Sequence, residues 1–129
     1  MIQKLYTPSK RKTFHFGFSL DDEFITITTE KGYEHQYLKR ALEDLYLWLW
    51  EEKQGGWVFL GSTGEENTPQ PETVEAWARA KENPIGGFYG ITAGRKGRFS
   101  SYIPSILEFQ GFAEIENKSQ NIRMRALSA

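Results

Sequence analysis

The stretch SILEFQGFAEIENKSQNIRMRAL, residues 105–127, decides the fold of this chain. Its first apolar residues, Ile106 and Leu107, fall at helical spacing, and Gly111 is the kind of residue at which a helix ends. Two runs of alternating apolar and charged residues follow, separated by a polar segment, which predicts a β-hairpin with a polar tip. A short helix followed directly by a hairpin therefore closes the chain.

A longer helix is predicted upstream, over residues 33–54. Leu38, Leu42, Leu45 and Leu49 recur at three- and four-residue spacing, which is the pattern of one buried helix face. The run LYLWLW inside this segment also alternates like a strand, but it belongs to the longer helical period and has no breaker nearby. Two glycines then end the helix, and a short apolar run over 57–63 predicts a strand.

Two further helices are predicted between that strand and the closing hairpin. The first spans residues 71–84, with Pro71 at a position that tolerates its missing N–H and with Trp77 in its buried stripe. The second begins at Ser101, a residue type suited to the N-cap, and places Pro104 in its first turn.

The N-terminal third predicts a second β-hairpin. Phe14, Phe16 and Phe18 alternate along one run, an acidic turn follows, and residues 24–30 alternate again. The length of 129 residues argues for one domain. We therefore expect an α+β fold in which a hairpin extension, residues 1–32, precedes a core formed by residues 33–129.

The order of elements from residue 34 onward resembles the winged helix-turn-helix superfamily over about residues 34–127. In that family the third helix enters the major groove of DNA, and the final hairpin is the wing beside it. The long connection over 82–98 and the N-terminal hairpin depart from this pattern. The resemblance implies a winged-helix-like core with DNA contacts from the exposed start of the third helix and from the wing, at Ser101, Tyr102, Ser105, Lys118, Gln120 and Asn121.

The loop GGFYGITAGRKGRFSSY, residues 86–102, carries three cations among glycines and aromatic rings. Arg95, Lys96 and Arg98 could contact backbone phosphates, because glycines let the main chain approach an anion closely. The alternative is a solvated basic turn. The loop has neither the Walker A ending nor the dinucleotide fingerprint, so we do not expect a mononucleotide site.

Aromatic side chains in the same loop leave two alternatives open. Tyr89 and Tyr102 could stack on nucleic-acid bases, as rings do in single-strand-binding proteins, or they could belong to the core. Of the aromatic residues in this loop, these two are the better surface candidates, because each carries a polar hydroxyl.

Basic residues elsewhere also have two interpretations. Residues 10–12 form a basic arm that could lie along nucleic acid or remain a solvated terminus. Arg123 and Arg125 share one face of the last strand and could also reach DNA. Glu114 and Glu116 share a face of the facing strand, and cross-strand ion pairs would cancel these charges.

Several classes of site find no support in the sequence. The chain has no cysteine, which excludes disulfides, thiol catalysis and thiolate metal ligands. His15 and His35 lie outside any metal-binding spacing, and no serine has a nucleophile-elbow context. No apolar run is long enough to span a membrane. We expect a cytoplasmic protein without catalytic activity, metal, cofactor or small-molecule substrate.

The leading hypothesis is a nucleic-acid-binding protein, with double-stranded DNA as the ligand, in a regulatory or accessory role. It requires that basic segments far apart in the sequence meet around the start of the third helix. The alternative is a protein-interaction or assembly module, in which the aromatic helix with Tyr46, Trp48 and Trp50 contacts a partner such as a second copy of the chain.

Overall fold

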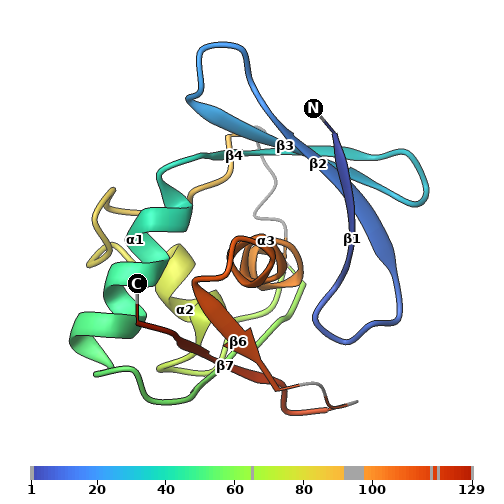
Figure 1. Ribbon diagram of the computed structural model, residues 1–129. Helices are drawn as coiled ribbons and strands as arrows, with labels where there is room; N and C mark the ends of the chain where they lie inside the picture. The colour runs from blue at the N-terminus through green and yellow to red at the C-terminus, as the bar shows by residue number, and fades with distance from the viewer. Residues whose placement is uncertain (1, 65, 92–97, 117, 119, 129) are drawn as a thin grey trace.

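The computed structural model describes all residues except 1, 65, 92–97, 117, 119 and 129. Within the described chain, two antiparallel sheets and three α-helices form an α+β architecture. Figure 1 shows helix α3, Ile103–Phe109, at the centre of the molecule, with the first sheet on one side and the strands of the second sheet on the other. This central position of α3 governs what its surface can contact.

The first sheet is a meander of four strands in the order β1-β2-β3-β4. Its strands are β1 (Gln3–Tyr6), β2 (Thr13–Phe18), β3 (Phe24–Thr29) and β4 (Glu34–Leu38). The predicted hairpin of β2 and β3 is confirmed. Phe14, Phe16, Ile25 and Ile27 alternate toward the interior and are buried, as the period of two along a strand requires.

Strand β4 corrects the prediction that residues 33–54 begin a helix. Gly32, at φ 87°, turns the chain back after β3, so that Tyr37 pairs with Ile25 in the sheet. On its far side β4 is bonded to residues 89–91, where the Leu38 N–H donates to the Tyr89 carbonyl. The first sheet therefore extends to Leu38, beyond the residue 32 expected for the hairpin extension.

The long helix begins after this strand. Helix α1 spans Ala41–Leu47 and continues as a π-helical turn, η1, over Trp48–Glu52. Leu42, Leu45 and Leu49 are buried along one face, as their spacing predicts.

Helix α2, Val74–Arg79, starts later than predicted. Thr73 is its N-cap and accepts a hydrogen bond from the Ala76 N–H at 3.2 Å, whereas Pro71 lies outside the helix. The cap hydroxyl satisfies one of the free amides at the helix start.

Helix α3 also has a different start. Ser101 belongs to the 3-10 turn η2, Phe99–Ser101, and Tyr102 occupies the N-cap position without a side-chain cap. The prediction of Ser101 as N-cap is therefore wrong. Pro104 lies in the first turn of α3, as predicted.

The second sheet has three strands in the order β5-β7-β6. They are β5 (Val58–Phe59), β6 (Ala113–Ile115) and β7 (Arg123–Ala126), and the closing hairpin is confirmed. From α1 onward the elements follow one another in the order α1, β5, α2, α3, β6 and β7.

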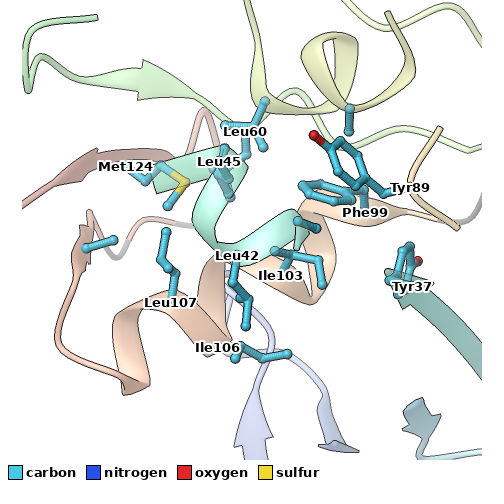
Figure 2. Close-up of a cluster of buried hydrophobic side chains, with 14 of the residues drawn as sticks. Tyr37, Leu42, Leu45, Leu60, Tyr89, Phe99, Ile103, Ile106, Leu107 and Met124 are labelled. Atoms are coloured by element: carbon cyan, nitrogen blue, oxygen red, sulfur yellow. The ribbon is translucent and has the colours of Figure 1, made fainter. Parts of the chain in front are cut away.

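One buried cluster joins the helices to both sheets (Figure 2). Ile103, Ile106 and Leu107 of α3 are each at most 1% exposed. The ring of Phe16 lies 6.2 Å from that of Phe109, so the first sheet also contacts the end of α3. Because both sheets pack on it, α3 is a core helix.

Candidate nucleic-acid interface

A groove of about 820 Å³ opens where the β1–β2 turn, the start of the α3 region and the β6–β7 hairpin approach one another. Residues 7–9, 11 and 12 form one part of its wall, and residues 59–62, 70, 71 and 73 contribute the segments around β5 and before α2. Arg98, Ser101 and Tyr102 line it from the start of the α3 region, and residues 120–122 line it from the hairpin.

Three cations line the groove, and they come from segments far apart in the sequence: Arg11, Lys12 and Arg98. All three side chains are exposed. Among the described residues no aspartate or glutamate lines the groove, and none forms an ion pair with these three cations. The groove therefore carries uncompensated positive charge, which attracts anions.

The β1–β2 turn holds the basic arm in a defined conformation. The Thr7 N–H donates to the Lys12 carbonyl at 2.9 Å, and the Lys10 N–H donates to the Thr7 carbonyl at 2.8 Å. Thr7 itself is buried, so the turn is anchored to the body of the protein. Residues 10–12 therefore belong to the connection between β1 and β2 and are not a free terminus, and their side chains are exposed to solvent.

Arg98 is positioned by a buried network directly behind it. Ser100 donates from its N–H at 3.0 Å and from its hydroxyl at 2.7 Å to Oε1 of Glu75, whose side chain has no exposed surface. Arg79 bonds the other carboxylate oxygen through Nε at 3.0 Å. Burial raises the pKa of Glu75, and the bonds from Ser100 and the charge of Arg79 oppose that rise. This network fixes η2 and with it the backbone that carries Arg98.

The predicted contacts at the start of α3 are only partly brought together. Ser101 and Tyr102 line the groove, but Ser105 is 6% exposed, so the prediction that it is exposed is wrong. Ser105 lies within the run 103–107 of α3, all of whose residues are buried, so the surface that was expected to be open is packed in the interior.

Of the two tyrosines that sequence reasoning offered for stacking, Tyr89 is buried and Tyr102 is half-buried. Tyr89 is fully buried, and its hydroxyl donates to Asp44 at 2.8 Å. The ring of Tyr102 lies 5.2 Å from Phe14 and 6.0 Å from His35. Burial raises the pKa of the Tyr102 hydroxyl. The structure supports the core alternative for Tyr89, whereas Tyr102 packs against the core on one side and also lines the groove.

The two arginines of β7 form ion pairs across the β6–β7 hairpin. Arg125 bonds Glu114 at 2.7 Å and Arg123 bonds Glu116 at 2.8 Å, which confirms the cross-strand pairs considered above. Lys118 also bonds Glu116 at 2.8 Å. The hydrogen bonds from Arg123 and Lys118 lower the pKa of Glu116 to about 2. These three cations share two carboxylates, Glu114 and Glu116, and none of the three lines the groove.

Trp57 adds a second contact for the paired arginines. The guanidinium carbons of Arg123 and Arg125 lie 4.6 and 4.7 Å from the centre of its indole ring.

Of the wing residues expected to touch DNA, Gln120 and Asn121 line the groove. Arg95 and Lys96, predicted to hold phosphates, lie outside the described residues.

A second hollow, of about 570 Å³, lies beside α1. Leu42, Leu107 and Phe112 contribute apolar lining, and charged residues such as Lys39 and Glu43 surround them. Tyr46 of the aromatic helix, the proposed partner surface of the alternative hypothesis, also lines this hollow. Arg11, Lys12 and Arg98 do not line it.

Two negative findings concern the described residues. They contain no group of three histidine, cysteine, aspartate or glutamate side chains placed to hold a metal ion. None of their helices combines the length and the apolar character that crossing a bilayer demands.

Comparison with known proteins gives one match. No curated protein and no solved structure matches the chain. A family model described as "Family of unknown function (DUF6855)" matches residues 3–127, a range that includes both sheets and all the helices described above. The chain therefore belongs to the DUF6855 family.

Proposed function

We propose that this protein binds nucleic acid in a regulatory or accessory role without catalysis. The groove lined by Arg11, Lys12 and Arg98, called the basic groove below, would contact the phosphate backbone of the nucleic acid. The observation that carries the proposal is the meeting of Arg11, Lys12 and Arg98 beside the start of the α3 region, with no carboxylate among the described residues that line the groove. Phosphates are the anions that arginine and lysine side chains contact most in nucleic-acid complexes.

The element order supports a winged-helix-like unit over residues 41–126. α1, β5, α2, α3 and the β6–β7 hairpin follow one another as in that superfamily, and β5 joins the hairpin in one sheet. The contact surface we propose differs from the usual one. Since the first sheet covers α3, contacts come from the groove at the start of the α3 region and from the hairpin tip, not from a helix inserted in a major groove.

Phosphate binding predicts a specific dependence on salt. Each phosphate that a cation neutralises releases condensed counterions, so the logarithm of the affinity falls with the logarithm of the salt concentration, with a slope of roughly −0.9 per contact for duplex DNA. Three groove cations therefore account for a slope of about −2.7.

The first prediction tests this directly. Fluorescence anisotropy with labelled duplex and single-stranded oligonucleotides, over a series of salt concentrations, should show binding by the wild type. The variant Arg11→Ala/Lys12→Ala/Arg98→Ala should bind weakly and lose about 2.7 from the slope with duplex DNA. The matched control, Lys4→Ala/Lys53→Ala/Lys81→Ala, removes the same charge outside the groove and should retain the wild-type slope.

Two outcomes contradict the proposal. If the wild type binds neither probe at low salt, the groove is not a nucleic-acid site. If the control variant loses as much affinity as the groove variant, binding depends on overall charge and not on this groove.

A second candidate function is protein interaction or self-association through the aromatic helix. The observation in its favour is that Trp50 and Phe112 are each 42% exposed, on either side of Tyr46. The Tyr46 ring lies 6.4 Å from that of Trp50 and 5.7 Å from that of Phe112. Exposed rings gathered in this way favour a partner surface.

A further inference from the structure

We propose that the ligand of the basic groove is single-stranded nucleic acid, with a base stacked on the exposed ring of Phe59 while Arg11, Lys12 and Arg98 hold the backbone. This inference rests on the proposed function and names its ligand. The observations behind it are the position of Phe59, the polar groups beside it and the covered surface of α3.

Phe59 is an aromatic side chain that the fold leaves at the groove wall. Its neighbours along the chain, Val58 and Leu60, are 5% and 3% exposed, whereas Phe59 is 53% exposed and lines the groove. Strand geometry explains the difference, since alternate residues of β5 point to opposite faces. The buried side of the strand packs in the core, so the ring of Phe59 is directed away from it.

The ring of Phe59 is also free of other rings within the described part of the chain. Phenylalanines of the first sheet such as Phe14 and Phe16 have another aromatic ring as a neighbour. No such neighbour is found for Phe59 among the described residues. A base could therefore stack on it without displacing another aromatic ring.

Polar side chains line the same groove as this ring. The Leu60 N–H donates to the Ile122 carbonyl at 2.9 Å, which holds β5 against the hairpin tip. Gln120 and Asn121 precede Ile122, line the groove and are exposed. Their amides offer donors and acceptors for the edges of an unpaired base. The groove thus combines cations for phosphates, a ring for a base face and amides for a base edge.

A duplex cannot use this combination. Base faces are hidden within a double helix, which presents only phosphates, sugars and groove edges. Recognition of a major groove by a helix needs an exposed helix surface, and Ser105 on α3 is only 6% exposed. A single strand exposes its base faces and binds where a basic groove runs beside aromatic rings.

The experiment compares three labelled probes of equal length at one salt concentration: an oligothymidylate, a single strand of the same length made of abasic sites, and a DNA duplex. The abasic strand has phosphates but no bases, so it isolates the stacking contribution. We expect the wild type to bind the oligothymidylate more tightly than either other probe.

The variants separate stacking from charge. Phe59→Ala should weaken oligothymidylate binding by roughly 5- to 150-fold, the range for one base–aromatic stack, and leave abasic binding unchanged. Phe59→Trp, which keeps an aromatic face, should retain the wild-type preference. The variant Arg11→Ala/Lys12→Ala/Arg98→Ala should weaken all three probes.

The outcomes distinguish this inference from the proposed function. If no probe binds, both fail. If binding depends on the groove cations but the duplex or the abasic strand binds as tightly as the oligothymidylate, phosphate binding stands and the single-strand inference is overturned. Base stacking on this ring is likewise overturned if Phe59→Ala leaves oligothymidylate binding unchanged or weakens abasic binding equally.

Discussion

Glu75 is an acidic side chain without exposed surface, and its partners explain how the fold tolerates it. A buried carboxylate loses its hydration and must be compensated by bonds and an opposite charge. Ser100 supplies two hydrogen bonds and Arg79 supplies the charge. Arg79 in turn donates to the carbonyls of Thr63 and Gly64, so one ion pair fastens α2, η2 and the preceding loop together.

The second prediction concerns the pH dependence of this ion pair. Because burial raises the pKa of Glu75 above its ordinary 4.5, the folded state binds the proton more tightly than the unfolded state does. The stability that the protonated Glu75 carboxyl contributes is therefore fully present below pH 4.5, and it declines as the pH rises through the raised pKa. The free energies of unfolding of wild type and Glu75→Gln can be measured by urea unfolding at a series of pH values from acidic to neutral. As the pH rises, the wild type should lose stability relative to Glu75→Gln. A difference that grows in favour of the wild type would mean that Arg79 and Ser100 outweigh desolvation.

At this scale the sequence identifies residue types more readily than their surroundings. Arg98 and Ser101 were named for the site and both line the groove. Ser105 looked equally suitable, yet it is buried, because the exposure of a helical serine depends on what packs over the helix. Glu75 and Phe59 were not recognised, since their roles depend on Ser100 and on the hairpin tip, both remote in sequence.

The helix formed by α1 and η1 places two neighbouring tryptophans in different environments. The ring of Trp48 lies 5.3 Å from that of Trp77, in a stacked arrangement against the core. Trp50 is 42% exposed and stacks on Tyr46. The two side chains therefore offer a matched pair for the aromatic-helix hypothesis.

The third prediction uses this pair. Trp48→Ala should lower the free energy of unfolding by about 3 kcal/mol, because it removes a large packed ring, and Trp50→Ala should lower it by less. If the helix mediates self-association, sedimentation velocity should show that Trp50→Ala shifts the wild-type oligomer toward monomer, with little effect of salt. A wild type that is monomeric at all concentrations would exclude self-association.

At the scale of elements, local periodicity predicted most of the helix and strand positions but failed at β4. The segment before α1 contains Leu38 at a helical distance from Ala41 and Leu42, so it matched the helix that follows. Its actual partner is β3, to which Gly32 returns the chain. Strand pairing depends on that partner, and a period within one segment does not reveal it.

The two sheets and α3 share one core, which makes the molecule a single packing unit. Phe14 of the first sheet contacts Tyr102 at the start of α3, and Phe16 contacts Phe109 at its end. The four tryptophans, at 48, 50, 57 and 77, all lie outside the first sheet. Tryptophan fluorescence therefore reports on the remainder of the chain.

The fourth prediction follows from this arrangement. Phe14→Ala should cost about 3–5 kcal/mol and move the urea midpoint equally in tryptophan fluorescence and far-UV circular dichroism. His15→Ala, which changes the exposed neighbour on the same strand, should shift both by no more than about 0.5 kcal/mol. If Phe14→Ala left the fluorescence transition in place, the first sheet would unfold separately.

For the whole molecule, the order of elements from α1 to β7 was predictable because each element has a local signature. The cover that the first sheet places over α3 was not. The alternation of Phe14 and Phe16 shows that β2 has a buried face, but the pattern does not say which surface that face meets. The expected open recognition helix was wrong for this reason.

The widened turn of η1 has a consequence for which side chains can meet. In an ordinary α-helix, residues five apart are rotated by about 140° around the axis and point in different directions. Here the Lys53 N–H reaches the Trp48 carbonyl at 3.1 Å, and the Lys53 ammonium stands 5.1 Å above the Trp48 ring. The extra residue in the coil thus brings Lys53 over the Trp48 indole, whereas a regular α-helical winding would turn two residues five apart in different directions.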